Sequence, residues 1–446
     1  MDSNKEKLLV VLPIERLISV VDSSNTLLEL SKKYSVTLLG QKSAKLPGNF
    51  QPLHFNEGNV GRRIREVLLN VNSIRKITQV KSFETRVSNT MGIGIQELNS
   101  LRVNRFLLLR YFWKPRTFLA VFIALSKERG ALERTLIRYS FWWPSLNRVL
   151  VRVRPEVVLI FSGGAFSGVE NILLGKSRRL GIKTALVIDN WDNLSSKSLF
   201  TSSPNALGVW GPNMHRDALE IHSMSPRIVR HVGSARFRPN ERPSPQSRPP
   251  FVLFAGSGKP LFNELAALID LRLMLDRKQL STLHIIYRPH PMSRVDQNSI
   301  ADLIEKLERV ELDSSFSGPL ESNFYKSEPL EELENLCRLA TFIIAPLSSI
   351  IVEGLSLGTP VVSLNWTSNP TADLPLSEYT HFLELQDVHG FFPVTSWEEL
   401  ESQLTDVIAC KGEKNLVPEI LPSFNTRYAD RVVSLVEELM DSEKSN

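Results

Sequence analysis

The sequence predicts an α/β protein made of two doubly wound, Rossmann-like domains, each built on a parallel β-sheet. Short, continuously apolar runs alternate with longer amphipathic segments along most of the 446-residue chain, which is the pattern of βαβ units. A proline-rich stretch at 237–250 interrupts this alternation, which then restarts. The length also exceeds that of one domain, since domains commonly hold about 100–200 residues.

In the first half, we expect residues 1–236 to form one domain. The predicted strands are Leu8–Ile14, Ser35–Leu39, Val157–Phe161 and Thr184–Ile188, and the predicted helices include Thr26–Lys33, Arg62–Val71 and Val169–Leu180. The strands are apolar throughout because both faces of a parallel sheet are covered.

Residues 101–154 do not fit a compact βαβ unit, and we expect a basic, aromatic helical insertion there. Residues 101–150 hold 10 Lys and Arg against 2 Asp and Glu, and tryptophans such as Trp113 and Trp142 lie among them. Long helices packed on the sheet with solvated arginines explain this composition. A surface that lies against anionic lipid headgroups explains it too.

After the linker at 237–250, we expect a second domain over residues 251–425. The predicted strands are Phe251–Ala255, Leu283–Tyr287, Thr341–Ala345 and Pro360–Leu364, and the predicted helices are Leu261–Leu275, Ser299–Glu308, Leu330–Leu339 and Ile350–Leu357. Residues 426–446 follow as a closing amphipathic helix, Tyr428–Asp441, and a tail. Ligands bind at the carboxyl ends of such strands, so we expect a deep cleft between the domains to hold the site.

The net charge of +5 hides an asymmetry between the halves. Residues 1–250 hold 38 Lys and Arg against 18 Asp and Glu, a net of +20, whereas residues 251–446 hold 15 against 30, a net of −15. The basic half suits an anionic partner. Nucleic acid is not expected, because no helix-turn-helix, RRM or OB pattern accompanies the charge. The two cysteines suit a reducing compartment.

A rigid loop with two cationic side chains follows the predicted strand Leu283–Tyr287. Prolines at 289 and 291 fix Arg288 and His290, which can both donate to phosphate oxygens. A histidine can also protonate a departing phosphate. The alternative is a stiff turn with exposed polar residues.

A second group of polar residues follows the predicted strands Phe251–Ala255 and Thr341–Ala345. Ser348 and Ser349 open a helix, whose N-terminus can bind an anion, and Glu353 one turn later can accept from ribose hydroxyls. Ordinary helix capping explains the serines equally well. Gly256, Ser257 and Lys259 do not form a P-loop but can cradle phosphate.

Two loops of the first half are also candidates. Gly163 and Gly164 follow a predicted strand and allow a ligand to approach the backbone closely. The next strand is followed by Asp189-Asn-Trp-Asp-Asn193, which offers a sugar platform with carboxylates beside it. A turn held by Asx side-chain hydrogen bonds is the structural alternative.

The second half resembles the nucleotide-binding half of GT-B glycosyltransferases. In that family a glutamate in a Glu-x-x-x-x-Gly-x-Pro-like helix commonly holds the donor ribose, and Glu353, Gly358 and Pro360 match it. The His290–Pro291 and Ser348–Ser349 pairs are similar to motifs of CDP-glycerol glycerophosphotransferases and bacterial sialyltransferases. The Asp189–Asn193 loop resembles one that recurs in bacterial surface-carbohydrate biosynthesis proteins of GT-B type.

The resemblance implies a metal-independent, nucleotide-sugar-dependent glycosyltransferase that acts in surface-polysaccharide or capsule biosynthesis. Its donor would be CMP-, CDP- or UDP-linked, with no other cofactor, and its acceptor a glycan or a lipid-linked sugar. Ala345 stands where many retaining members carry a second glutamate, which favours inversion. We expect a cytoplasmic protein, peripheral at the inner membrane if residues 101–154 bind anionic lipid.

Each candidate residue has a role in this account. We expect Gly256, Ser257, Lys259, Arg288, His290, Ser348, Ser349 and Glu353 to bind the donor; Asp192 or Asp189 to act as base and His290 as acid; and Gly163, Gly164, Trp191 and Asn193 to contact the acceptor. Two alternatives stay open: a UDP-sugar 2-epimerase of the same fold, and a non-catalytic binding protein on a transferase scaffold.

Overall fold

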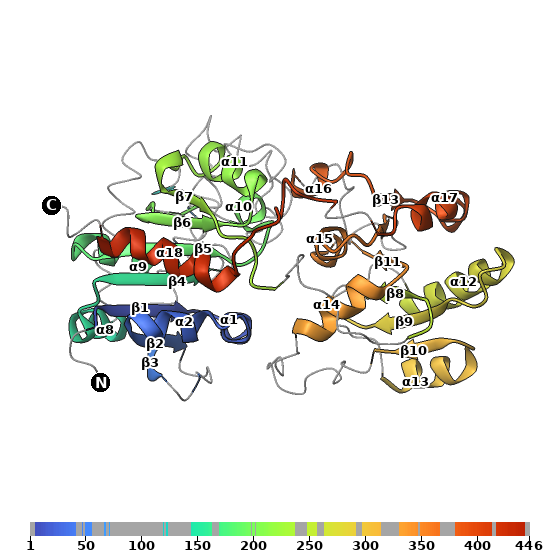
Figure 1. Ribbon diagram of the computed structural model, residues 1–446, viewed down its shortest axis with the longest axis horizontal. Coiled ribbons are helices and arrows are strands. Elements are labelled where there is room, and N and C mark those ends of the chain that lie inside the picture. The colour runs from blue at the N-terminus through green and yellow to red at the C-terminus, as the bar shows by residue number, and fades with distance from the viewer. Residues whose placement is uncertain are drawn as a thin grey trace. The chain divides into compact units, whose positions relative to one another are not determined.

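The computed structural model confirms the predicted fold class. It describes residues 5–41, 47, 50–55, 67, 71, 119, 122–123, 144–162, 169–197, 199–200, 202–236, 248–256, 263–290, 297–313, 330–346, 348–365, 380–412 and 416–441. The chain forms two compact units: unit 1 contains residues 1–235 and 425–446, and unit 2 contains residues 236–424. Each unit is a parallel β-sheet with helices on both faces (Figure 1).

The sheet of unit 1 has seven parallel strands in the order β3-β2-β1-β4-β5-β6-β7. The strands are β1 (Lys7–Leu12), β2 (Ser35–Gln41), β3 (Gln51–Phe55), β4 (Val157–Ser162), β5 (Lys183–Ile188), β6 (Ala206–Val209) and β7 (Val229–His231). β1 lies beside β4, with Val10 opposite Leu159. The strand order therefore reverses between β1 and β4, which makes this the switch point of the sheet.

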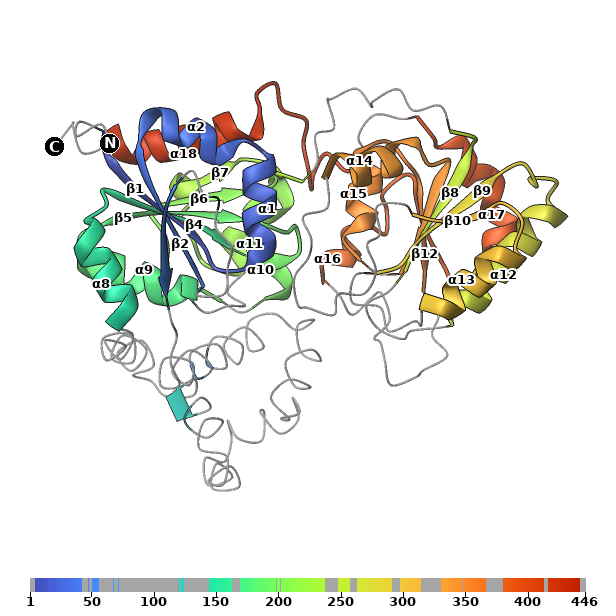
Figure 2. The same ribbon diagram turned by 90° about the horizontal axis from the view of Figure 1, so that it is seen from below.

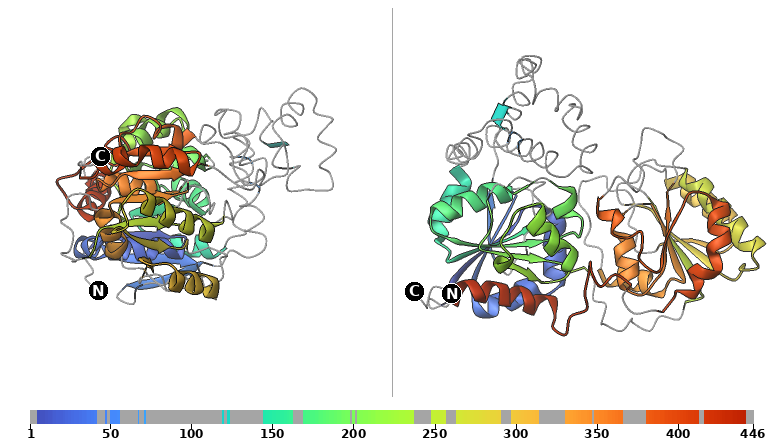
Figure 3. Two further views of the ribbon diagram at one scale, coloured as in Figure 1. Left: turned by 90° about the vertical axis from the view of Figure 1, so that its right-hand side faces the viewer. Right: turned by 90° about the horizontal axis from the view of Figure 1, so that it is seen from above.

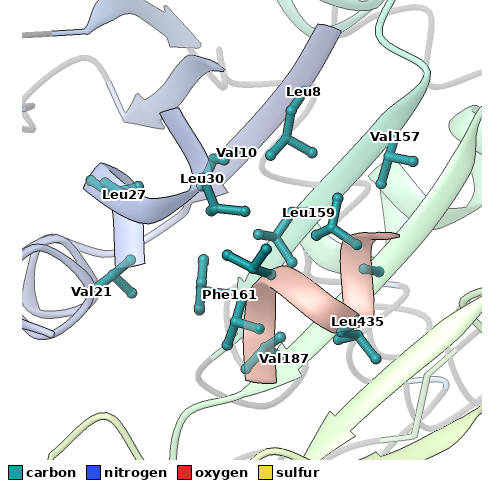
Figure 4. Close-up of a cluster of buried hydrophobic side chains, with 14 of the residues drawn as sticks. Leu8, Val10, Val21, Leu27, Leu30, Val157, Leu159, Phe161, Val187 and Leu435 are labelled. Atoms are coloured by element: carbon teal, nitrogen blue, oxygen red, sulfur yellow. The ribbon is translucent and has the colours of Figure 1, made fainter. Parts of the chain in front are cut away.

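The helices of unit 1 cover both faces of its sheet. Those in its described part are α1 (Glu15–Ser23), α2 (Thr26–Lys33), α8 (Pro144–Val153), α9 (Val169–Arg179), α10 (Asn193–Ser196), α11 (Pro212–Glu220) and α18 (Tyr428–Asp441). Figure 4 shows the core under α1, α2 and α18, where Leu30, Leu159, Val187 and Leu435 meet. α8 and α9 lie on the opposite face (Figure 2).

The C-terminal helix α18 is an integral part of unit 1. This helix packs beside α2 on one face of the sheet (Figure 2). Its apolar face, formed by Val432, Leu435, Val436 and Leu439, is buried in the core of unit 1. From the sequence, residues 426–446 are expected to form a separate closing segment. The structure joins this helix to unit 1, because its apolar face completes the core over β4 and β5.

The sheet of unit 2 has six parallel strands in the order β10-β9-β8-β11-β12-β13. The strands are β8 (Phe251–Ala255), β9 (His284–Arg288), β10 (Val310–Leu312), β11 (Phe342–Ala345), β12 (Val361–Leu364) and β13 (Phe391–Val394). β8 lies between β9 and β11, with Ala255 opposite Arg288 and Phe254 opposite Ile344. The switch point therefore falls between β8 and β11.

The helices of unit 2 also form two layers. They are α12 (Glu264–Arg277), α13 (Gln297–Lys306), α14 (Leu330–Leu339), α15 (Ile350–Ser356), α16 (Thr380–Leu383) and α17 (Trp397–Ala409). α12, α13 and α17 pack on one face through residues such as Leu271, Ile300 and Leu404, and α14 and α15 cover the other (Figure 3).

Parts of the sequence prediction fall outside the described residues. Of the expected insertion at 101–154, the structure describes residues 119, 122–123 and 144–154, which include the helix α8, so the insertion as a whole stays a prediction. The expected helix Arg62–Val71 lies outside the described residues except for positions 67 and 71. Of the expected linker at 237–250, residues 237–247 lie outside them. In the described part of the chain, no helix combines the length and the apolarity needed to span a bilayer. The expected interdomain cleft stays a prediction.

Candidate functional site

The candidate donor residues of unit 2 follow three neighbouring strands at its switch point. Gly256 follows β8, His290 follows β9, and Ser348 and Ser349 follow β11. Because parallel strands end at the same edge of a sheet, these residues gather at the edge where doubly wound folds bind ligands. Ser257 and Lys259 lie outside the described residues.

Gly256 occupies a position with no room for a side chain. A Cβ added there would lie 2.5 Å from Glu264 Oε2 and 3.1 Å from the backbone nitrogen of His290. The Gly256 N–H donates to the carbonyl oxygen of Arg288 at 2.9 Å, which ties the end of β8 to the end of β9. The glycine therefore brings these two strand ends into close contact.

A buried carboxylate behind Gly256 was not among the predicted site residues. Glu264, in the first turn of α12, accepts a hydrogen bond from Tyr287 Oη at 2.5 Å, and both side chains are buried. Burial raises the pKa of Tyr287 well above its usual range, and the neighbouring charge of Glu264 raises it further. Asn263 caps α12 by accepting from the N–H of Ala266 at 3.2 Å. An Asn-Glu pair at a helix start was the available sequence signal.

Arg288 is buried and ion-paired in the structure. Its Nη1 donates to Asp313 Oδ2, at the end of β10, and both side chains are largely inaccessible to solvent. From the sequence, Arg288 is expected to donate to phosphate oxygens. Its pairing with Asp313 gives it a second role, in joining β9 to β10, and its contact with phosphate stays a prediction.

His290 is half-buried at the end of β9. Burial lowers its pKa below the usual value, and the positive charge of Arg288 lowers it further. The imidazole is therefore neutral in the free protein at pH 7 and above. A bound phosphate would favour its protonated form, because an anion stabilises a neighbouring cation.

Ser348 and Ser349 are half-buried between β11 and α15. Ser349 occupies the N-cap position of α15, but its side chain makes no capping hydrogen bond. Its carbonyl oxygen accepts from the N–H of Glu353 at 3.2 Å. Ordinary capping therefore does not explain this serine.

Glu353 lies within α15 and is only 2% exposed. Its Oε1 lies 2.9 Å from Nη2 of Arg236, the first residue of unit 2, whose side chain is 13% exposed. The predicted ribose-binding carboxylate is therefore held by a cation that the sequence analysis did not single out.

Several other ionisable groups of unit 2 lie near Glu353 and Arg288. Burial raises the pKa of the Cys337 thiol, and the charges of Glu353 and Glu334 raise it further. The positive charges of Arg288 and Lys411 act in the opposite direction and lower it. Burial lowers the pKa of Lys411 to about 8. The ammonium of Lys411 donates to the carbonyl oxygen of Arg338 and to Thr359 Oγ1, both at 2.6 Å.

In unit 1, Asp189 is buried at the end of β5. Its N–H donates to the carbonyl oxygen of Ser162 at 2.9 Å, which links the ends of β5 and β4. Burial raises the pKa of Tyr428 on α18, and the negative charge of Asp189 raises it further. The predicted role of Asp189 as a catalytic base stays a prediction.

The rest of the Asp-Asn-Trp-Asp-Asn loop is built into unit 1. The carboxylate of Asp192 accepts from Ser196 Oγ at 2.5 Å and lies 3.7 Å from Lys197 Nζ. Trp191 is 3% exposed, so its ring does not present a face to solvent as a sugar platform would. Asn193 is also 3% exposed, and its Nδ2 has no hydrogen-bond partner among the described residues.

The two predicted acceptor glycines and the candidate metal ligands complete the comparison with the sequence prediction. Gly163 and Gly164 lie outside the described residues, so their approach to an acceptor stays a prediction. Within the described ranges, no three His, Cys, Asp or Glu side chains gather closely enough to hold a metal ion.

Comparisons with known proteins find similar structures but no similar sequences. No family model matches the chain, and no curated protein matches its sequence. A UDP-GlcNAc 2-epimerase from Methanocaldococcus jannaschii, in complex with UDP-GlcNAc and UDP, has a TM-score of 0.51 at 13% identity, with 97% of this chain and 99% of that chain covered. A protein assigned as a UDP-N-acetylglucosamine 2-epimerase from Listeria monocytogenes has a TM-score of 0.52 at 11% identity, with 98% and 97% covered.

A lipopolysaccharide outer core galactosyltransferase is also similar, with a TM-score of 0.44 at 11% identity and with 97% of this chain and 99% of that chain covered. Identities this low show the fold alone. The chain has two parallel-sheet, Rossmann-like domains, and its fold is of the GT-B type.

Proposed function

We propose that the protein is a glycosyltransferase that moves a sugar from a nucleotide-activated donor to a glycan or lipid-linked acceptor. The observation that carries the proposal is the set of polar groups at the switch point of unit 2. Gly256, His290 and the Ser348–Ser349 pair follow three neighbouring strands. The glycine lets a phosphate approach the backbone closely. The imidazole and the two hydroxyls can donate hydrogen bonds to the phosphate oxygens.

The remaining donor contacts follow from the residues near this edge. Ser257 and Lys259 continue the loop after Gly256 and would add a hydroxyl and an ammonium to the phosphates. Arg288 lies one residue before the His290 loop and would contribute long-range positive charge. Glu353 would accept from the ribose hydroxyls. The donor would be linked to CMP, CDP or UDP.

Charge stabilisation by protein groups is the proposed basis of catalysis. As the bond from the sugar to the nucleotide breaks, negative charge develops on the phosphate oxygens. Arg288, His290 and the two serines would stabilise this charge, and His290 can supply a proton. We therefore propose a metal-independent reaction, which predicts full activity in EDTA.

The acceptor is assigned to unit 1. Asn193 Nδ2, buried and without a hydrogen-bond partner in the described part of unit 1, would donate to an acceptor oxygen. Asp192 or Asp189 would accept the proton of the attacking hydroxyl, which fits an inverting reaction. Gly163, Gly164 and Trp191 would line the same subsite. The loop would have to open for Trp191 to reach an acceptor, because its ring is buried.

A lipid-linked acceptor would place the protein at the cytoplasmic face of a membrane. The basic side chains of residues 101–154 would then face anionic headgroups. Flotation with anionic and neutral vesicles tests this part. Replacement of several arginines between Arg102 and Arg154 should release the protein from anionic vesicles, and unchanged binding would contradict the role of this segment.

A UDP-sugar 2-epimerase is the second candidate function. The specific observation in its favour is that two of the matched structures with TM-scores above 0.5 carry this assignment. In that reaction the sugar would be inverted at carbon 2 while no acceptor took part. The two candidates share the donor subsite and differ in whether an acceptor is needed.

The experiment that separates them follows single donors by ¹H and ³¹P NMR in EDTA. The full chain is incubated with UDP-GlcNAc, UDP-glucose, CMP-sialic acid or CDP-glycerol, with and without a lipid-linked glycan extract. Glu353→Gln is the test variant. Glu438→Gln is the matched control, since Glu438 lies in an exposed ion pair with Arg230 in unit 1.

The outcomes are distinct. Acceptor-dependent nucleotide release that Glu353→Gln reduces and Glu438→Gln does not would support the transferase. An epimerised nucleotide sugar without acceptor would establish the alternative instead. A complete lack of turnover together with a lack of nucleotide binding would overturn both and favour a non-catalytic scaffold.

A further inference from the structure

We propose that Arg236 is a positioning residue of the ribose subsite, which holds the carboxylate of Glu353 ionised and oriented for the donor's ribose hydroxyls. This inference rests on the proposed function, in which Glu353 binds ribose. It assigns a role to the first residue of unit 2, which lies outside the motifs that resemble those of nucleotide-sugar enzymes.

The geometry of the pair is the first argument. Arg236 Nη2 lies 2.9 Å from Glu353 Oε1, and the carboxylate side chain is 2% exposed. A carboxylate buried to this extent takes up a proton unless a cation or several donors stabilise its charge. Arg236 supplies that cation from the start of unit 2.

Among the described residues, the other charged groups of this region make ion pairs or hydrogen bonds with further residues. Arg288 is ion-paired with Asp313, and Lys411 donates to Arg338 and Thr359. On α14, Glu334 is ion-paired with Arg338 at 2.8 Å, and Cys337 is a buried neutral thiol. β11 and β12, which flank α15, contribute no titratable side chain.

The chemistry of ribose recognition needs the ionised form. A carboxylate offers about four lone-pair positions and no donor, so it can pair with a guanidinium and still accept from vicinal hydroxyls. A protonated acid donates from one oxygen and loses part of this capacity. Removal of the Arg236 charge should therefore weaken ribose recognition at neutral pH, and deprotonation of Glu353 at higher pH should restore it.

The test compares how tightly the protein binds 2′-deoxynucleotides and ribonucleotides. The measured quantity is the dissociation constant of the deoxynucleotide divided by that of the ribonucleotide. Calorimetry with CDP, UDP, dCDP and dUDP from pH 6.5 to 9 gives this ratio, in which the titrations of phosphate and of His290 cancel. The proteins are the wild type, Arg236→Gln, Arg236→Lys and Glu353→Gln. Arg277→Met is the control, because Arg277 lies in an exposed ion pair with Glu401 in unit 2.

The wild type should prefer the ribonucleotide by about tenfold or more at every pH, which corresponds to a hydrogen bond to a charged group. Arg236→Gln should lose most of this preference at pH 6.5–7.5 and regain part of it toward pH 9. Arg236→Lys should be intermediate at all pH values, because an ammonium keeps the charge but does not place it where the Nη2 of Arg236 lies. Arg277→Met should behave as the wild type.

Two failures are distinguishable. Glu353 does not bind ribose if the wild type does not prefer ribonucleotides, or if Glu353→Gln keeps the preference. In either case the proposed role of Arg236 is wrong as well. If Glu353→Gln loses the preference but Arg236→Gln keeps it at every pH, the inference about Arg236 alone is overturned. Should Arg236→Gln not fold, Arg236→Lys decides: a ratio unchanged from the wild type overturns the inference.

Discussion

Tyr287 Oη donates a hydrogen bond of 2.5 Å to Glu264 Oε2 in the interior of unit 2. The tyrosine belongs to β9 and the glutamate to α12, so the bond joins a strand to the helix that follows its neighbouring strand β8. The same carboxylate oxygen lies against Gly256. Glu264 therefore connects the end of β8 at Gly256 to Tyr287 of β9 in the buried layer next to the proposed donor subsite.

Replacement of Gly256 by alanine tests how tight this arrangement is. The new Cβ would lie 2.5 Å from Glu264 Oε2, which Tyr287 holds in place, and 3.1 Å from the nitrogen of His290. We expect a loss of about 1–3 kcal/mol of stability from overpacking, measured by urea unfolding. Nucleotide affinity, measured by calorimetry, should also fall.

Gly208→Ala is the matched control for this variant. Its Cβ would lie 2.9 Å from a side-chain carbon of Val232 in unit 1, so it should also destabilise the protein. It should leave the affinity of the remaining folded protein for nucleotides unchanged. Wild-type affinity in Gly256→Ala would contradict the placement of the donor phosphates at this glycine.

Tyr287→Phe removes one donor from the buried carboxylate of Glu264. We expect a loss of about 1–3 kcal/mol in the free energy of unfolding. The reason is that the buried carboxylate keeps its desolvation cost while it loses a hydrogen-bond donor.

A double-mutant cycle with Glu264→Gln, followed by urea unfolding, isolates this interaction. The two single changes should be coupled by about 0.5–3 kcal/mol, because the two side chains share one buried hydrogen bond. Additive effects would show that this hydrogen bond does not stabilise the fold.

His290 should make nucleotide binding depend on pH. Burial and then the charge of Arg288 lower its pKa, so the free protein holds a neutral imidazole at pH 7.5. Because a bound phosphate favours the imidazolium, affinity should increase as the pH falls from 7.5 toward 5.5, with uptake of a proton. Calorimetry in buffers of different ionisation enthalpy measures that proton.

His290→Gln should remove the protein's part of this uptake and leave only that of the nucleotide phosphate. His284→Gln is the control, since His284 lies on the same strand but faces Glu311 at 3.0 Å. Proton uptake that persists in His290→Gln and disappears in His284→Gln would show that His290 does not face the phosphates.

The C-terminal helix should be essential to the stability of unit 1. Leu435 is buried in its core, and its replacement by alanine should cost about 2–5 kcal/mol in urea unfolding. Ser434→Ala is the control, because Ser434 is exposed on the same helix. Equal stabilities of the two variants would contradict the packing of α18 on this sheet.

The fold could be predicted where the physical signal is local and strong. β8 is fully buried and apolar, and α18 has one continuous apolar face, so the expected ranges Phe251–Ala255 and Tyr428–Asp441 match the structure. In unit 2, the strands that were not predicted are β10 and β13. β10 has three residues with a central glutamate, and β13 contains Pro393, which an edge strand tolerates.

The candidate site could be predicted only in part. The loops after β8, β9 and β11 carry glycine, histidine and serine at strand ends, which is a local signal. The pairing of Arg236 with Glu353 and of Tyr287 with Glu264 depends on tertiary structure, because the partners lie far apart in the sequence. The burial of Trp191 likewise depends on the surrounding core, and its sequence context favoured an exposed ring.

The most direct test of the proposed function is nucleotide binding by the full chain. Thermal-shift and calorimetric measurements with CMP, CDP, UDP, GDP and ADP, beside His290→Ala, ask whether unit 2 holds a nucleotide. We expect one nucleotide class to stabilise the wild type, by about 2.7 kcal/mol at 100 times its dissociation constant, and His290→Ala to reduce that effect. Binding of none of the five by the folded wild type would contradict the proposal of a nucleotide-sugar enzyme.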